Sequence, residues 1–110
     1  MTTIDEFIKE VTSIKQGTEL RDFLLGYENY YLESCGNFAL LTPEFVTLTN
    51  VERLYIDLHA PFASFHMPIY GFIVVPSQHV DIEELLAVSP IGSKKIVAPN
   101  GEKAIRILLT

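Results

Sequence analysis

Residues 53–76 read RLYIDLHAPFASFHMPIYGFIVVP, and both ends of this stretch are typical of β-strands. Apolar and polar residues alternate in 53–59, which predicts a strand with one buried and one exposed face. Residues 69–75 are apolar on both faces, which predicts a strand inside the sheet that ends at Pro76. The buried face of the first strand holds Leu54, Ile56 and Leu58, opposite Tyr55, Asp57 and His59. The faces of the second hold Ile69, Ile73 and Val75, opposite Tyr70, Phe72 and Val74.

The connection between these strands, HAPFASFHMP at 59–68, is unusually apolar for a loop. Connections are normally polar and rich in turn residues. Phe62 and Phe65 lie three positions apart, so one turn can present them side by side. Together with His66 and Met67 they are candidate partner-binding residues. The alternative is that both phenylalanines fold back beneath the sheet and belong to the core.

Together with this stretch, the patterns in the rest of the sequence predict an α+β domain with a mainly antiparallel sheet. Strands follow one another without the alternating helices of a parallel sheet. The expected helices are 4–14, 20–25 and 80–88, and the expected strands are 30–34, 38–42, 45–49, 53–59, 69–75, 94–98 and 103–109. We therefore expect one domain over residues 1–110, with five to seven strands, two N-terminal helices, and a third helix before a C-terminal hairpin.

Local signals set the expected ends of several elements. Thr3 with Glu6 fits a capping box for the first helix, and Thr18 is a candidate cap for the second. Cys35-Gly36-Asn37 predicts a hairpin with a three-residue loop. Asn100-Gly101 predicts a second hairpin with a type I′ turn, in which both residues adopt positive φ.

Charge and composition exclude several function classes. The chain of 110 residues has a net charge of −6 and is 48% hydrophobic, too apolar for a disordered chain. Residues 54–93 contain no Lys or Arg, and the one basic cluster is Lys94, Lys95, Lys103 and Arg106. We interpret that cluster as a solvated strand face, which argues against direct nucleic-acid binding. No apolar run is long enough to span a membrane.

Neither a signal peptide nor a disulfide framework is expected from the sequence. The N-terminus MTTIDEFIKE is acidic and amphipathic, without a basic region followed by an apolar one. Cys35 is the single cysteine, so no disulfide forms within the chain. Together these features favour the cytoplasm.

Residues of catalytic type are present but match no motif. The three histidines, His59, His66 and His79, lack the spacing of a zinc site, so no metal or cofactor is expected. Glu33 near Cys35 disfavours the reactive thiolate. Asp57 and His59 share a strand face and Ser64 follows, but no glycine creates a nucleophile elbow at Ser64.

A second aromatic segment, Tyr27-Glu28-Asn29-Tyr30-Tyr31, adds Tyr27, Tyr30 and Tyr31 to the candidate partner-binding residues. Tyrosine is enriched at protein interfaces. Residues 22–52 also carry five acidic residues and no basic one, so this surface can dock on a basic protein face. The alternative is an aromatic junction that packs locally.

The sequence favours a small acidic interaction protein that acts by binding rather than catalysis. A regulator, an inhibitor or an immunity-type partner, such as those of phages and mobile elements, fits this description, and so does self-association. The alternative is a small-molecule-binding protein or minor hydrolase with a pocket around Tyr55, Asp57, His59 and His66. A shallow, exposed apolar patch would favour the first class, and a concave pocket with converging polar groups the second.

Overall fold

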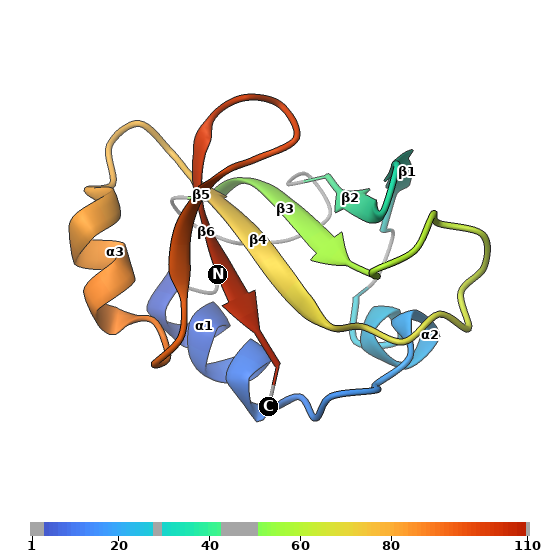
Figure 1. Ribbon diagram of the computed structural model, residues 1–110. Coiled ribbons are helices and arrows are strands. Elements are labelled where there is room, and N and C mark those ends of the chain that lie inside the picture. The colour runs from blue at the N-terminus through green and yellow to red at the C-terminus, as the bar shows by residue number, and fades with distance from the viewer. Residues whose placement is uncertain (1–3, 28–29, 43–50, 110) are drawn as a thin grey trace.

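The protein is an α+β domain built on an antiparallel sheet (Figure 1). The computed structural model describes residues 4–27, 30–42 and 51–109. Within them the sheet has six strands in the order β1-β2-β3-β4-β6-β5. The elements are α1 (Ile4–Ser13), α2 (Leu20–Leu24), β1 (Leu32–Cys35), β2 (Phe38–Leu41), β3 (Val51–Asp57), β4 (Gly71–Pro76), α3 (Ile82–Val88), β5 (Lys94–Val97) and β6 (Lys103–Leu108). The predicted fold class is confirmed, whereas the cap at Thr3 and the strand at 45–49 lie outside the described residues.

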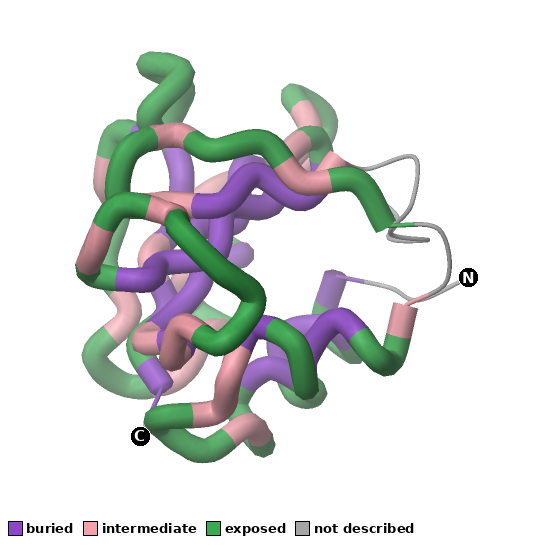
Figure 2. Tube along the Cα trace, turned by 90° about the vertical axis from the view of Figure 1, so that its right-hand side faces the viewer, coloured by how far each residue is buried: buried purple, intermediate pink, exposed green. Residues whose placement is uncertain are grey.

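One face of the sheet packs against α1 and α2. Phe7 of α1 and Phe23 of α2 both contact Phe72 of β4, with ring centroids 6.1 Å and 5.2 Å apart. The apolar stripe of α1 is buried here, as its spacing predicts. The largest buried members of this cluster on the strands are Leu41, Leu54, Ile56, Phe72 and Ile105. The buried stretches gather inside the molecule, and the connecting segments are exposed around them (Figure 2).

The opposite face of the sheet also carries a buried cluster, and this corrects one prediction. The buried residues of this cluster are Leu40, Tyr55, Ile73, Val75, Ala98 and Ala104. Cys35 and Phe38 from the β1–β2 hairpin and Ile96 from β5 pack against it, so both ends of the sheet contribute to its cover. The alternation in 53–59 predicted that Tyr55, Asp57 and His59 are exposed. Tyr55 and Asp57 are instead 2% and 1% exposed, and only His59 is exposed.

Strand β4 lies inside the sheet, between β3 and β6, as predicted. Tyr55 pairs with Ile73, and Ile73 pairs with Arg106. The predicted grouping of Ile69 with Ile73 and Val75 is wrong, because Ile69 belongs to the helix-side cluster. Ile69 precedes the first residue of β4, so the alternation of the strand does not apply to it.

Three predicted turns or caps differ in detail. Cys35 pairs directly with Phe38, so the first hairpin loop has two residues, and Gly36 takes φ 67°. At the second hairpin only Gly101 has positive φ, and its N–H donates to the Ala98 carbonyl at 2.8 Å. This is a three-residue loop of the type I plus bulge kind, not a type I′ turn. Glu19 rather than Thr18 occupies the N-cap of α2.

Candidate functional site

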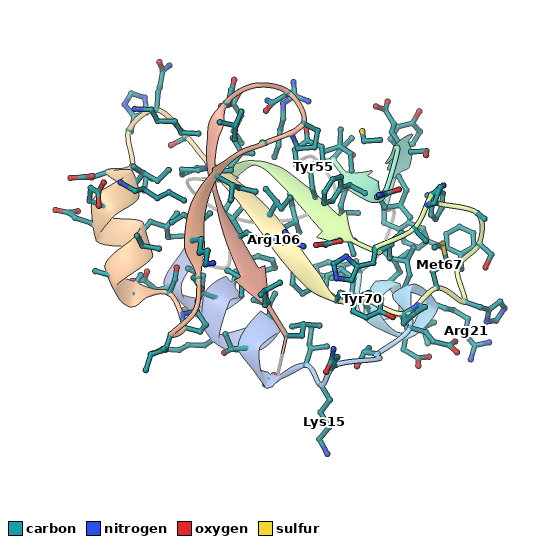
Figure 3. The ribbon with its side chains drawn as sticks, in the orientation of Figure 1. Lys15, Arg21, Tyr55, Met67, Tyr70 and Arg106 are labelled. Carbon is teal, nitrogen blue, oxygen red and sulfur yellow. The ribbon has the colours of Figure 1, made fainter. Side chains whose placement is uncertain are left out.

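The segment 59–68 is held in one shape by its backbone. It passes beside α2, where Met67 and Arg21 lie at the same end of the molecule (Figure 3). Main-chain hydrogen bonds join it to neighbouring segments. The N–H groups of Arg21 and Leu20 on α2 donate to the carbonyls of Phe65 at 2.7 Å and Met67 at 2.9 Å. The Phe62 N–H donates to the Gly36 carbonyl at 3.1 Å, and the N–H of the next residue after the segment, Ile69, donates to the Thr18 carbonyl at 2.7 Å. Partners at both ends of the segment therefore fix where its side chains point.

The side chains of this segment divide between core and surface. Phe62 and Met67 are partly buried and pack against the helix-side cluster. Phe65 remains 43% exposed, and His66 is exposed as well. The core alternative therefore holds in part for Phe62, whereas Phe65 lies at the surface and its role in partner binding stays a prediction.

Phe65 is the centre of an exposed group of aromatic rings. Its ring lies 6.1 Å from that of Phe62 and 6.3 Å from that of Tyr30, both in edge-to-face geometry. This geometry is the favourable one for aromatic pairs. Tyr30 is itself 40% exposed. We call Tyr30, Phe62 and Phe65 the aromatic patch; it joins residues from the two segments that the sequence singled out separately.

Charged groups border the aromatic patch. His66 Nδ1 lies 3.4 Å from Glu19 Oε2, and both side chains are exposed. Arg21 Nη2 lies 3.8 Å from Asp22 Oδ1, also at the surface. Exposed pairs of this kind contribute little stability, so these groups remain open to other partners.

The other two tyrosines of the candidate set lie differently. Tyr27 packs on Phe23, with ring centroids 5.1 Å apart, and belongs to the edge of the helix-side cluster. Burial and the nearby Glu10 carboxylate raise the pKa of Tyr27 to about 12. Tyr31 is 51% exposed next to the aromatic patch in sequence.

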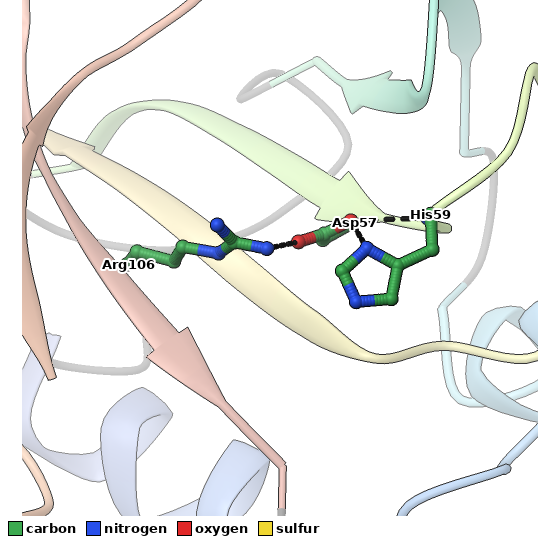
Figure 4. Close-up of polar contacts among 3 residues, drawn as sticks. All are labelled: Asp57, His59 and Arg106. Carbon is green, nitrogen blue, oxygen red and sulfur yellow. Dashed lines mark hydrogen bonds and ion pairs between the residues drawn. The ribbon is translucent and has the colours of Figure 1, made fainter. Parts of the chain in front are cut away.

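Asp57 is the buried polar centre of the alternative pocket (Figure 4). Asp57 Oδ2 accepts a hydrogen bond from Arg106 Nη2 at 2.5 Å. Asp57 Oδ1 accepts one from the His59 backbone N–H at 3.1 Å and lies 3.4 Å from His59 Nδ1. The His59 ring stacks on Tyr70 at 4.4 Å. The carboxylate therefore has partners on both oxygens, as a buried charge requires.

Of the remaining residues of the alternative pocket, Tyr55 lies on the same buried face of β3 as Asp57, and His66 does not join this group. His66 lies against Glu19 instead. Burial raises the pKa of Tyr55, with nearby Cys35 and Glu102 acting in the same direction and Arg53 opposing. Ser64 Oγ accepts a hydrogen bond from the His66 N–H, and within the described residues no hydrogen bond joins it to His59. Among the residues that the structure describes, no hydroxyl group hydrogen-bonds to His59, and the pocket stays a prediction.

Cys35 is a free thiol of intermediate exposure. Burial and the Glu33 carboxylate raise its pKa, against the opposing effect of Arg53. The expected influence of Glu33 is confirmed, and a raised pKa disfavours the reactive thiolate.

Arg106 is the residue whose place sequence reasoning missed. It was assigned to a solvated basic face with Lys94, Lys95 and Lys103, and those three lysines are exposed. Arg106 is instead intermediate in exposure and ion-paired with Asp57. Its position on β6, opposite Ile73 of the central strand, points it to the second buried face. The register between β6 and β4 is set by the pairing of strands far apart in the chain, so the sequence around Arg106 does not reveal it.

Two searches of the described ranges bear on other functions. No three His, Cys, Asp or Glu side chains in 4–27, 30–42 and 51–109 lie close enough to hold a metal ion. None of the helices in those same ranges has both the length and the apolar character needed to cross a bilayer.

Comparisons with known protein families, with curated proteins and with solved structures found no match.

Proposed function

We propose that this protein acts by binding another protein through the aromatic patch, and not by catalysis. The observation that carries the proposal is the position of Phe65, which is 43% exposed between the rings of Phe62 and Tyr30. Exposed aromatic groups on a fixed surface are typical of interface anchors.

The fixed backbone around Phe65 supports this role. The Phe65 carbonyl accepts a hydrogen bond from the Arg21 N–H, and the partly buried Phe62 and Met67 attach the segment to the core. A surface that already has its bound shape loses little conformational entropy on association. The segment therefore resembles a preorganised binding loop more than a flexible connection.

The charge around the patch defines the partner's chemistry. Glu19, Arg21 and Asp22 lie near the segment and together carry one net negative charge, and the whole chain has a net charge of −6. A partner with an apolar centre and a basic rim is complementary to this surface. Two copies that each carry a net charge of −6 repel one another, so we favour a different protein over self-association.

Such a binding role fits a cytoplasmic regulator, inhibitor or immunity-type partner. The free Cys35 thiol suits a reducing compartment. The absence of a converging nucleophile beside His59 in the described residues favours binding over hydrolysis.

The test is affinity capture from the cells that make the protein, followed by sedimentation of the purified chain. Phe65→Ser and Tyr30→Ser remove exposed rings, so the fold should be retained. Ile91→Ser is the matched control, because Ile91 is fully exposed elsewhere on the surface. We expect a basic partner that is captured by the unchanged chain and the control but lost with either patch variant. Equal capture by all four chains would overturn the proposal, and a dimer lost only in the patch variants would replace it with self-association.

A further inference from the structure

A concave surface lies between α1 and α2, and none of the residues that line it belongs to the Asp57 group. It is open to solvent and has a volume of about 740 Å³. This volume falls within the usual range for pockets that hold small organic ligands. We call it the α1–α2 cavity.

The wall of the α1–α2 cavity is apolar and aromatic. Val11 and Ile14 line it from the first helix and the residues after it, and Phe23 and Tyr27 line it from the second. The two aromatic rings lie 5.1 Å apart and are tilted by 54°. Val11 and Phe23 are buried, so their positions are fixed by the core and the cavity is preformed.

Two acidic residues and one basic residue line the α1–α2 cavity, which leaves it with one net negative charge. Glu10 from α1 and Asp22 from α2 both line it, so a carboxylate approaches from each side. Lys15 is the single basic residue among those that line it, and its side chain extends away from the body of the molecule (Figure 3). Within the described residues no ion pair involves Glu10, and the contact of Asp22 with Arg21 is long and exposed. The protein therefore neutralises this charge only in part, through Lys15 and through Arg21 at 3.8 Å from Asp22, and one net negative charge remains on the lining.

We infer that the α1–α2 cavity binds an organic cation, in which an ammonium or guanidinium group is carried on an apolar body. The apolar body would contact Val11, Ile14 and the ring of Phe23. The cationic group would lie near the aromatic rings and the two carboxylates, which both attract positive charge. An anion would meet two carboxylates and is disfavoured.

The protonation of Tyr27 agrees with this assignment. Burial and the Glu10 carboxylate both disfavour the phenolate, so Tyr27 stays neutral far above neutral pH. Glu10 therefore lies close enough to the Tyr27 phenol to raise its pKa.

The same chemistry has two sources, a free amine or a Lys or Arg side chain of a partner protein. The inference does not depend on the aromatic patch, because Tyr30, Phe62 and Phe65 do not line the cavity, although Asp22 borders both surfaces. The two sources differ in which probe binds more tightly, and the experiment includes both.

In the experiment each probe is titrated into the full chain, and binding is measured from the changes in the NMR chemical shifts of the backbone amides. The probes are 2-phenylethylammonium, the neutral isostere 2-phenylethanol and the anion 3-phenylpropionate. For a ligand of this size we expect a Kd on the order of 1 mM for the ammonium, with shifts at residues around the cavity. The alcohol should bind roughly fivefold more weakly, and the carboxylate more weakly still.

Variants connect the binding to the two carboxylates. Glu10→Gln combined with Asp22→Asn should weaken binding of the ammonium by about fivefold to tenfold, without changing that of the alcohol. Both positions are exposed, so the fold should be retained. The control is Glu83→Gln combined with Glu84→Gln on α3, which also removes two carboxylates, from positions that do not line the cavity, and should leave binding unchanged.

The last experiment measures the binding of a capped peptide that carries one lysine between apolar residues. Its control is the same peptide with norleucine in place of the lysine. Tighter binding of the lysine peptide than of the free amine assigns the cavity to a partner's side chain, and the reverse assigns it to a small molecule. Equal binding of the ammonium and the alcohol would overturn the inference. So would the absence of shifts with ~20 mM ammonium, well above the expected Kd.

Discussion

Replacing Arg106 with methionine should destabilise the protein, because it leaves the Asp57 carboxylate without its main partner. Asp57 is 1% exposed, so water cannot take the place of the guanidinium. Breaking a fully buried ion pair costs about 3–5 kcal/mol. Arg106 itself is 34% exposed, and the His59 N–H still reaches Asp57, so we expect a cost of about 2–3 kcal/mol.

The assay is urea unfolding of each variant, monitored by far-UV circular dichroism. Arg106→Met should lower the unfolding midpoint without changing the slope. In a thermal melt the same loss corresponds to a decrease in Tm of roughly 10 °C. Asp57→Asn and the double variant complete a double-mutant cycle, which isolates the energy of the pair from the cost of each change alone.

The reasoning predicts a coupling energy of about 1–3 kcal/mol between Asp57 and Arg106. A coupling within about 0.3 kcal/mol of zero would refute it, because independent sites add within that range. Such a result would show that Asp57 is free for another role, as the alternative pocket requires.

Three further predictions concern the sheet and Tyr27. Ile73→Ala should cost about 2–5 kcal/mol in urea unfolding, because Ile73 is 1% exposed on the central strand. Gly71→Ala should destabilise by about 1–3 kcal/mol in the same assay, since a Cβ there would lie 2.3 Å from the Ile107 carbonyl oxygen and force β4 away from β6. The pKa of Tyr27 is raised from 10.0 to about 12 in the folded state, so its contribution to stability is complete below pH 10 and is lost as the pH rises to 12. Discounted for partial solvent exposure, this contribution is about 1–2 kcal/mol, and Tyr27→Phe should remove it from the measured pH dependence of unfolding.

The sequence predicted the class of fold because local patterns carry that information. The apolar stripe of α1 and the apolar run around Ile73 each identified an element and its burial. Details of turns were less predictable. Asn100-Gly101 is compatible with more than one hairpin loop, and the registers of β5 and β6 select the three-residue form.

The burial of Tyr55 and Asp57 was not predictable from the alternation of their strand. Alternation separates two faces but does not reveal whether the second one is covered. Here, side chains from the two outer hairpins pack over it, and those contacts join residues far apart in the chain. For the same reason Arg106 was placed in solvent although it lies against Asp57.

The aromatic patch was predictable in its members but not in its arrangement. The unusual composition of 59–68 and of the Tyr30 region marked both segments as candidates. Only the fold shows that Phe65 meets Tyr30, whereas Tyr27 turns toward Phe23. The α1–α2 cavity had no signal in the sequence, because it depends on the spacing between two helices.

The most direct test of binding through the aromatic patch is photo-crosslinking in the cells that make the protein. The chain carries p-benzoylphenylalanine in place of Phe65 or, as a control, in place of the exposed Ile91. We predict one discrete adduct with a basic protein from position 65, its loss when Tyr30→Ser is added, and no such adduct from position 91. No adduct from position 65, or the same adduct from both positions, would contradict the account.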